Sequence, residues 1–141
     1  THSIWHQPFT LDDVRPHRPC LQDHLGIELI EIGPDYLCAR MPVDARRISL
    51  GILHGGASVA LAETVGSTAA AFVVDPTKYR VVGQEINANH VRAISDGFVI
   101  GTARPLHLGR RSHVWEIRIT DEQDRLVCIS RLTMFVLEIS G

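Results

Sequence analysis

The sequence predicts a single α+β domain in which an antiparallel sheet covers one long helix. The 141 residues are 45% hydrophobic and carry a formal net charge of −2, which is typical of one globular domain that buries a core. One apolar helical stretch begins at residue 55 and ends near residue 74. Two strands are expected before it and four after it, with no second long helix, repeat or linker, so residues 1–141 are expected to form one domain.

Shorter elements are expected before the long helix. Thr10, followed by acidic residues in the next turn, is typical of a helix start and predicts a short helix over residues 10–16. Residues 27–43 contain two β-type runs divided by the turn signal Gly33-Pro34, which predicts a hairpin. Residues 44–53 are expected to form a loop.

Strands follow the long helix. The helix begins at Gly55-Gly56, and Asp75-Pro76 ends it. Residues 114–120 alternate strictly between apolar and polar side chains, which is typical of a half-buried antiparallel strand. The four strands expected after the helix span residues 80–89, 97–105, 113–121 and 126–139.

Composition argues against several classes of function. The near-neutral charge and a pI near 6.4 give no general reason to bind nucleic acid or an anionic membrane. The helical stretch is long enough to span a membrane, but it carries Glu63 and consists mainly of small residues, which favours a buried helix. Three cysteines without CxxC spacing are expected to be reduced, packed thiols, which predicts a cytoplasmic protein. No metal site or cofactor is expected.

Glu63 lies at the centre of this small-residue helix. Its helical neighbours include Ala60, Gly66, Ser67 and Ala70, which leave room for a second helix or a ligand. Either would shield the carboxylate from water, and an unpaired buried carboxylate is costly in free energy. A chemical role is one reason for keeping it there; a buried hydrogen-bond network or a solvent-facing helix edge is the alternative.

The start of the helix has complementary chemistry. Gly55 and Gly56 carry backbone N–H groups that no carbonyl within the helix accepts, so they are candidates for an oxyanion hole. The alternative, equally weighted, is that the two glycines are there only because they permit a tight turn into the helix. Gly55 and Glu63 lie eight residues apart, about 12 Å along a helix, too far to act on one carbonyl carbon. Two antiparallel copies would solve this, giving two composite sites in a homodimer.

Further motifs along nearly the whole chain show a family resemblance: MPVDAR, GILHGGASVALAET, VVGQEINANHVR, PLHLGR and SRLT. In this order they resemble the hotdog-fold acyl-CoA thioesterases, in the group of Arthrobacter-type 4-hydroxybenzoyl-CoA, 1,4-dihydroxy-2-naphthoyl-CoA and phenylacetate-pathway thioesterases. The resemblance implies a sheet curled around the helix, dimers paired edge to edge and a dimer of dimers. It also implies hydrolysis of an aromatic or medium-chain acyl-CoA to free acid and CoA, with no separate cofactor.

The same resemblance implies roles for individual residues. Glu63 would be the catalytic carboxylate, acting as nucleophile or as base for water. The Gly55 N–H would polarise the thioester carbonyl bound with the neighbouring subunit, and His54 and Ser67 would line the site. A loop histidine and a small hydroxyl on the helix face are the alternatives for the last two.

Coenzyme A carries phosphates, and residues 90–113 hold a local excess of arginine and histidine. With the resemblance, this predicts four residues near the nucleotide or the pantetheine arm; a solvated basic face is the alternative. The four are His90, Arg92, Arg110 and Arg131.

Position 48 departs from the family pattern. Ile48 stands where relatives carry a glutamine thought to contact the thioester or the attacking water, and the loop is one residue shorter. Either His54, Ser67 or Ser49 supplies the missing polar contact, or the substrate range or the rate differs. The alternative function is therefore an acyl-CoA or aryl-ligand binding protein with little or no hydrolysis. A hotdog dehydratase is disfavoured, because the helix lacks a second carboxylate.

Overall fold

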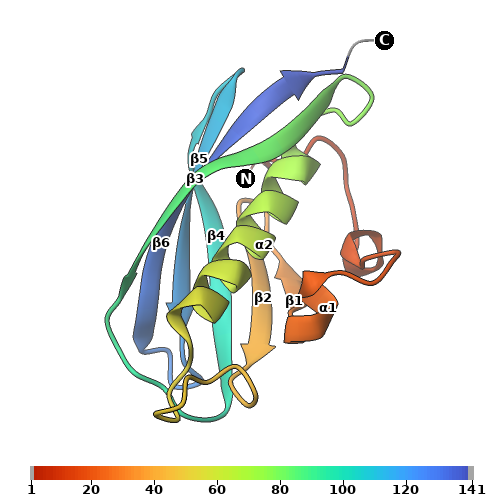
Figure 1. The fold of residues 1–141 in the computed structure, drawn as a ribbon. Helices are drawn as coiled ribbons and strands as arrows, with labels where there is room; N and C mark the ends of the chain where they lie inside the picture. Colours follow the sequence, from red (N-terminus) through yellow and green to blue (C-terminus); the bar gives the residue numbers. More distant parts are fainter. Residues whose placement is uncertain (1, 140–141) are drawn as a thin grey trace.

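The computed structural model describes residues 2–139. Six strands form one antiparallel sheet in the order β1-β2-β4-β5-β6-β3. The long helix α2, Gly55–Val73, lies against one face of it (Figure 1). The remaining elements are the 3-10 helix η1 (Leu11–Val14), α1 (Leu21–Leu25), β1 (Glu28–Ile32), β2 (Leu37–Pro42), β3 (Tyr79–His90), β4 (Phe98–Leu108), β5 (Ser112–Thr120) and β6 (Leu126–Glu138).

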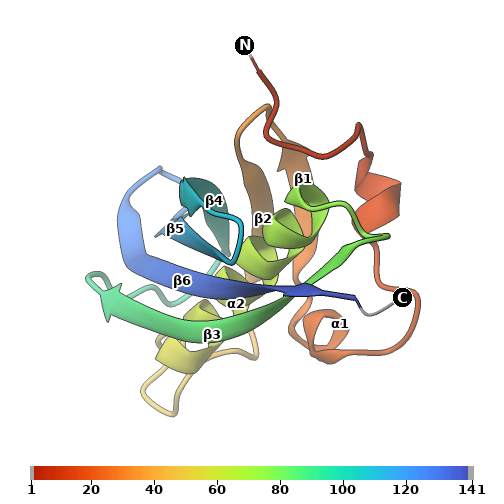
Figure 2. The same ribbon diagram turned by 90° about the horizontal axis from the view of Figure 1, so that it is seen from above.

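The predicted α+β architecture is confirmed, including two strands before α2 and four after it. Figure 2 shows the strands curving around α2, as the family resemblance implies. Strands β1 and β3 are the two edges of the sheet. The short helix expected over residues 10–16 is instead one 3-10 turn, begun where the Thr10 N–H donates to the Asp13 carboxylate over 2.8 Å.

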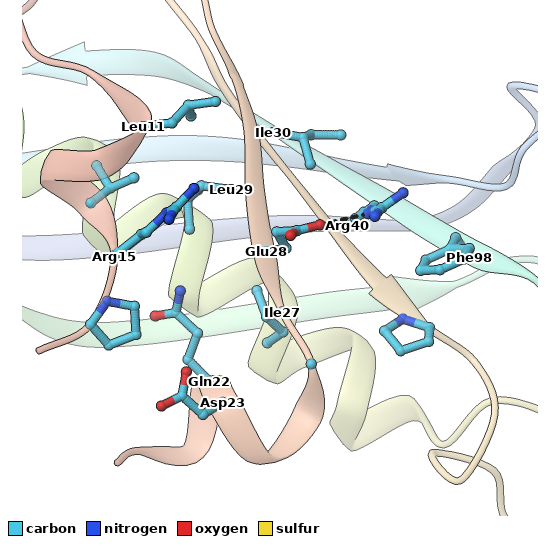
Figure 3. Close-up of a pocket in the computed structure, with 14 residues that line it drawn as sticks. Leu11, Arg15, Gln22, Asp23, Ile27, Glu28, Leu29, Ile30, Arg40 and Phe98 are labelled. Atoms are coloured by element: carbon cyan, nitrogen blue, oxygen red, sulfur yellow. Dashed lines mark hydrogen bonds and ion pairs between the residues drawn. The ribbon is translucent and has the colours of Figure 1, made fainter. Parts of the chain in front are cut away.

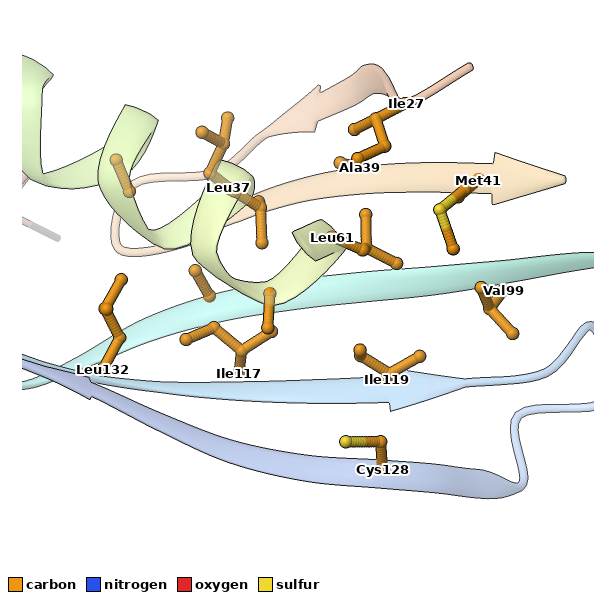
Figure 4. Close-up of a cluster of buried hydrophobic side chains, with 14 of the residues drawn as sticks. Ile27, Leu37, Ala39, Met41, Leu61, Val99, Ile117, Ile119, Cys128 and Leu132 are labelled. Carbon is orange, nitrogen blue, oxygen red and sulfur yellow. The ribbon is translucent and has the colours of Figure 1, made fainter. Parts of the chain in front are cut away.

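Small side chains let α2 lie close to the sheet. A Cβ at Gly66 would stand 2.7 Å from Leu132 Cδ2, so any larger residue at this crossing would force the buried Leu132 side chain to shift. The alternation predicted for β5 is confirmed, because Trp115, Ile117 and Ile119 are all fully buried. Figure 4 shows part of this core between α2 and the strands.

The sheet covers only one side of α2. Its buried residues all belong to one stripe: Ser58, Leu61, Ala62, Val65, Gly66, Ala69 and Ala70. The helix is long and apolar enough to cross a membrane by length and composition, yet here it is the core helix of the domain. Of the other helix residues only Gly56 and Ala71 are exposed, and the rest are partly buried, so the second side of this apolar helix is covered incompletely.

The N-terminal segment packs against the last turn of α2. Phe9 stacks on Phe72 with ring centroids 4.2 Å apart, and the His6 N–H donates to the Phe72 carbonyl over 2.9 Å. The Trp5 indole N–H donates to the Gly33 carbonyl in the turn between β1 and β2. These contacts fasten the segment to two elements that are distant in sequence.

The cysteines are free thiols, as predicted. Cys38 and Cys128 are buried in β2 and β6, and burial raises the pKa of both thiols. A raised pKa keeps them protonated at neutral pH, so they pack as small apolar side chains.

His113 in β5 is only 2% exposed, and its Nδ1 has no hydrogen-bond partner among the described residues. Burial, helped by the nearby His107, lowers the pKa of His113 below its ordinary value of 6.5. In the window between the lowered pKa and about 6.5, the unfolded chain binds a proton at this position and the folded chain does not. The free energy of unfolding therefore falls as the pH drops below about 6.5.

We predict that the variant His113→Gln, which has no titrating side chain at this position, loses less stability than the natural sequence between pH 7.5 and pH 5.5. Urea unfolding at the two pH values measures the difference in the free energy of unfolding. Equal losses in both proteins would contradict the prediction.

Candidate active site

Glu63 lies halfway along α2, beside the edge strand β3. It is half-buried, and its Oε2 stands 2.6 Å from the point where a Cβ at Gly83 would be. The same point lies 3.9 Å from the Met134 sulfur of β6. One helical turn further on, the Ser67 hydroxyl contacts that sulfur over 3.7 Å. The structure thus brings Glu63 and Ser67 together above Gly83 and Met134.

The first turn of α2 borders a separate cavity of about 430 Å³. Its lining includes Ile48, Gly55, Ser58, His90 and Arg92. A Cβ at Gly55 would stand 2.9 Å from His90 Nε2, so the imidazole lies directly against this glycine. Three predicted site residues therefore meet at the N-terminal end of α2, with Ile48 in the same wall.

His54 is the N-cap of α2. Its Nδ1 accepts a hydrogen bond from the Gly56 N–H over 2.8 Å. No helix carbonyl accepts from the Gly56 N–H, as expected, but the preceding side chain uses that donor, so Gly56 is not available to an oxyanion. The Gly55 N–H has no acceptor among the described residues and remains the candidate oxyanion donor.

Arg110 and Arg131 lie apart from both groups within one chain. Arg131 is exposed between the buried residues Ser130 and Leu132, so it projects from the face of the sheet opposite α2. Arg110 follows β4 and borders a cavity with Tyr79 and Phe135, at the end of the sheet remote from His90. A contact between either arginine and CoA stays a prediction.

A larger cavity of about 830 Å³ lies at the other edge of the sheet, around β1 (Figure 3). In its wall Glu28 and Arg40 form an ion pair over 2.9 Å, and the Arg40 guanidinium also lies 4.7 Å from the centre of the Phe98 ring. None of the predicted site residues lines this cavity. The cavity lies at the edge of the sheet opposite β3, away from Glu63, so we do not assign it to the chemistry of that residue.

Two residues beside Glu63 were not predicted from the sequence, Gly83 and Met134. A glycine inside the alternating run VVGQEI signals a bulge or a close approach, so Gly83 could have been found. Met134 could not, because its proximity depends on the register between β3 and β6. Within residues 2–139 no group of three His, Cys, Asp or Glu side chains is placed to hold a metal ion.

Comparison with known proteins identifies the family. The family model described as the thioesterase superfamily matches residues 50–128. The chain belongs to the thioesterase superfamily. Among its relatives are a 1,4-dihydroxy-2-naphthoyl-CoA hydrolase of Escherichia coli, 47% identical over 95% of this chain and 99% of that protein. The proofreading thioesterase EntH of Cronobacter turicensis is 49% identical over 95% of this chain and 98% of that protein.

Solved structures of thioesterases agree with this assignment. A glutamine-to-alanine mutant of a thioesterase from Pseudomonas aeruginosa superimposes with a TM-score of 0.95 at 42% identity, covering 97% of this chain and 100% of the other. A thioesterase from Haemophilus influenzae gives a TM-score of 0.93 at 42% identity, with 98% and 97% covered. The protein is thus a hotdog-fold thioesterase, as the motifs predicted.

We predict that His54→Ala destabilises the protein by about 1 kcal/mol, because the Gly56 N–H loses its capping acceptor. His54→Asn serves as the control, since its side-chain oxygen restores an acceptor and most of the stability. Urea unfolding monitored by circular dichroism measures both. An unchanged free energy of unfolding in His54→Ala would show that the cap contributes nothing.

Proposed function

We propose that this thioesterase hydrolyses acyl-CoA thioesters with an aromatic or medium-chain acyl group, using Glu63 of one subunit and the Gly55 N–H of another. The observation that carries the proposal is the pairing of two features on α2. One is a half-buried carboxylate at its centre, and the other is an unused N–H at its start, beside a cavity lined by His90 and Arg92. The CoA and aromatic parts of the proposal are supported by the E. coli relative, which is named as a hydrolase of an aromatic acyl-CoA.

Two copies are needed because the halves of the site lie about 12 Å apart along one helix. Two features of the chain support pairing at β3. This strand has an unpaired edge of 12 residues, and edges of that length are normally covered. Large apolar side chains on β3 and β6 are also exposed beside it: Val82 40%, Phe135 42% and Leu137 47%.

Antiparallel pairing of β3 with its copy would bring opposite ends of the two strands together. The Tyr79 end of one copy would then approach the His90 end of the other. Because Arg110 borders the same cavity as Tyr79, it would come near His90 and Arg92 of the neighbouring subunit. This supports a role for Arg110 at the phosphates of CoA, and no comparable argument supports Arg131.

The chemistry needs few groups. The Gly55 N–H, at the positive end of the α2 dipole, would hold the thioester oxygen as negative charge develops on it. Glu63 would attack the carbonyl carbon or take a proton from the attacking water; the geometry leaves both open. The carbon–sulfur bond then breaks, and the thiolate leaves with little acid assistance because a thiol has a pKa of roughly 8.5. If Glu63 is the nucleophile, the acyl group remains on it as an anhydride, which one water then hydrolyses to regenerate the carboxylate. By either route the net reaction adds one water and yields the acid and the free thiol.

We predict that Glu63→Gln lowers kcat for acyl-CoA hydrolysis on the order of 1,000-fold, because the substitution removes the nucleophile or base while keeping its shape. Release of free thiol from a panel of aromatic and medium-chain acyl-CoAs measures the rate. Glu85→Gln is the matched control, since Glu85 is an exposed carboxylate on β3, and it is expected to leave kcat unchanged.

The same panel separates hydrolysis from binding alone. Ile48 places an apolar side chain in the cavity wall beside Gly55, which favours the binding alternative more than a polar residue would. Tight binding of an acyl-CoA without thiol release by the natural sequence would establish that alternative and overturn the proposed hydrolysis.

We further predict that mixing two inactive variants restores activity. In a mixed dimer of Glu63→Ala and Gly55→Val subunits, one site combines an intact Gly55 with an intact Glu63. Random exchange at equal concentrations should therefore restore about a quarter of the natural activity per site, since half the dimers carry one good site of two. Thiol release before and after subunit exchange measures this. Absence of recovery despite proven exchange would mean that the site is not shared.

A further inference from the structure

Edge strand β3 contains a β-bulge beside Glu63. Its pairing with β6 is regular from Tyr79 to Gly83 and again from Glu85 to His90, but the register shifts between Gly83 and Glu85. Gly83 pairs with Met134 and Glu85 with the adjacent Thr133, so Gln84 is an extra residue in β3 without a partner residue in β6. Bulges of this kind occur most often at sheet edges and near active sites, where they redirect side chains.

Gly83 has no conformational reason to be glycine. Its φ does not lie in the left-handed region, where Gly26, Gly51 and Gly97 are found. Its paired residue on β6 is Met134, which is 1% exposed beneath α2, and paired residues share a face of the sheet. A side chain at position 83 would therefore point toward α2.

That space is taken by the Glu63 carboxylate. The 2.6 Å between Glu63 Oε2 and the Cβ position at Gly83 is shorter than real Cβ contacts, so a methyl group at position 83 would push the end of the Glu63 side chain aside. No hydrogen bond or ion pair among the described residues fixes this carboxylate. Its position is therefore set by packing between α2 and the bare backbone of Gly83.

The extra residue also sets which side chains face α2 further along β3. Without the bulge, alternation from Gly83 would turn residues 85, 87 and 89 toward the helix. With it, Ile86, Ala88 and His90 pair with the buried residues Leu132, Ser130 and Cys128. This is how His90 comes to lie against Gly55.

We propose that Gly83 and the bulge at Gln84 form one positioning device for both halves of the site. Gly83 is a positioning residue that admits and orients the Glu63 carboxylate, and the one-residue shift turns His90 toward the oxyanion donor Gly55. The inference rests on the proposed function, since that function gives Glu63 its catalytic role.

The test is a double-mutant cycle with Gly83→Ala and Glu63→Asp. Gly83→Ala should lower kcat by about 100-fold through a displaced carboxylate, with little change in KM or Tm. Aspartate has a shorter side chain and avoids the added methyl group, so Glu63→Asp should cost much less kcat in the Gly83→Ala background than alone. A purely structural role for Gly83 predicts effects that multiply independently, and that result would overturn the proposal.

Gly101→Ala is the matched control. It adds the same methyl group to the same face of the sheet, but against the Leu61 side chain at 3.3 Å. It should leave kcat unchanged even if Tm shifts. A loss of kcat equal to that of Gly83→Ala would show that any methyl group under α2 is harmful, and would also overturn the proposal.

A crystal structure of Gly83→Ala keeps this inference separate from the proposed function. If the natural sequence hydrolyses no thioester, the proposed function fails, and the position of the Glu63 carboxylate then decides. A displaced carboxylate would support positioning by Gly83, and an unmoved one would overturn it.

Discussion

The structure depends on one constraint: a single sheet can cover only one side of a single helix. Small residues let the strands come very close to α2, as the contacts of Gly66 with Leu132 and of Gly101 with Leu61 show. This closeness buries one stripe of the helix completely and leaves most of the rest only partly covered. Glu63 lies at the border between the two, half-buried beside an open strand edge. A functional site is therefore expected where α2 is only partly covered and the edge of β3 is unpaired.

That border suits the chemistry of a thioesterase. A carboxylate deep in the core would be protonated or would need a buried partner, whereas a fully exposed one would act in a high dielectric. At the border, a substrate or a second subunit can remove the remaining water only when the site is assembled. Under the proposed function, electrostatic stabilisation by the Gly55 N–H would then be strongest during reaction and would cost the free protein little.

Most of the fold was predictable from the sequence, because it follows from local periodicity. The bounds of α2 follow from Gly55-Gly56 and Asp75-Pro76, and the strict alternation in β5 fixed its buried face. Details that depend on pairing or on one side chain were not predictable. The capture of the Gly56 N–H by His54 needed the rotamer of a single imidazole. The projection of Arg131 away from α2 needed the register of β6 with its neighbours.

The bulge explains why the site lies at an edge strand and not under the centre of the sheet. An extra residue leaves backbone N–H and C=O groups unmatched, and in a central strand these groups would be buried without partners, at a high cost in free energy. In β3 one side of the strand is open, so water or another strand can satisfy them. A bulge that makes room for the carboxylate therefore costs the least folding free energy in an edge strand such as β3. Because an open edge is also where another sheet can pair, the geometry that admits Glu63 also places it where a second copy can complete the site.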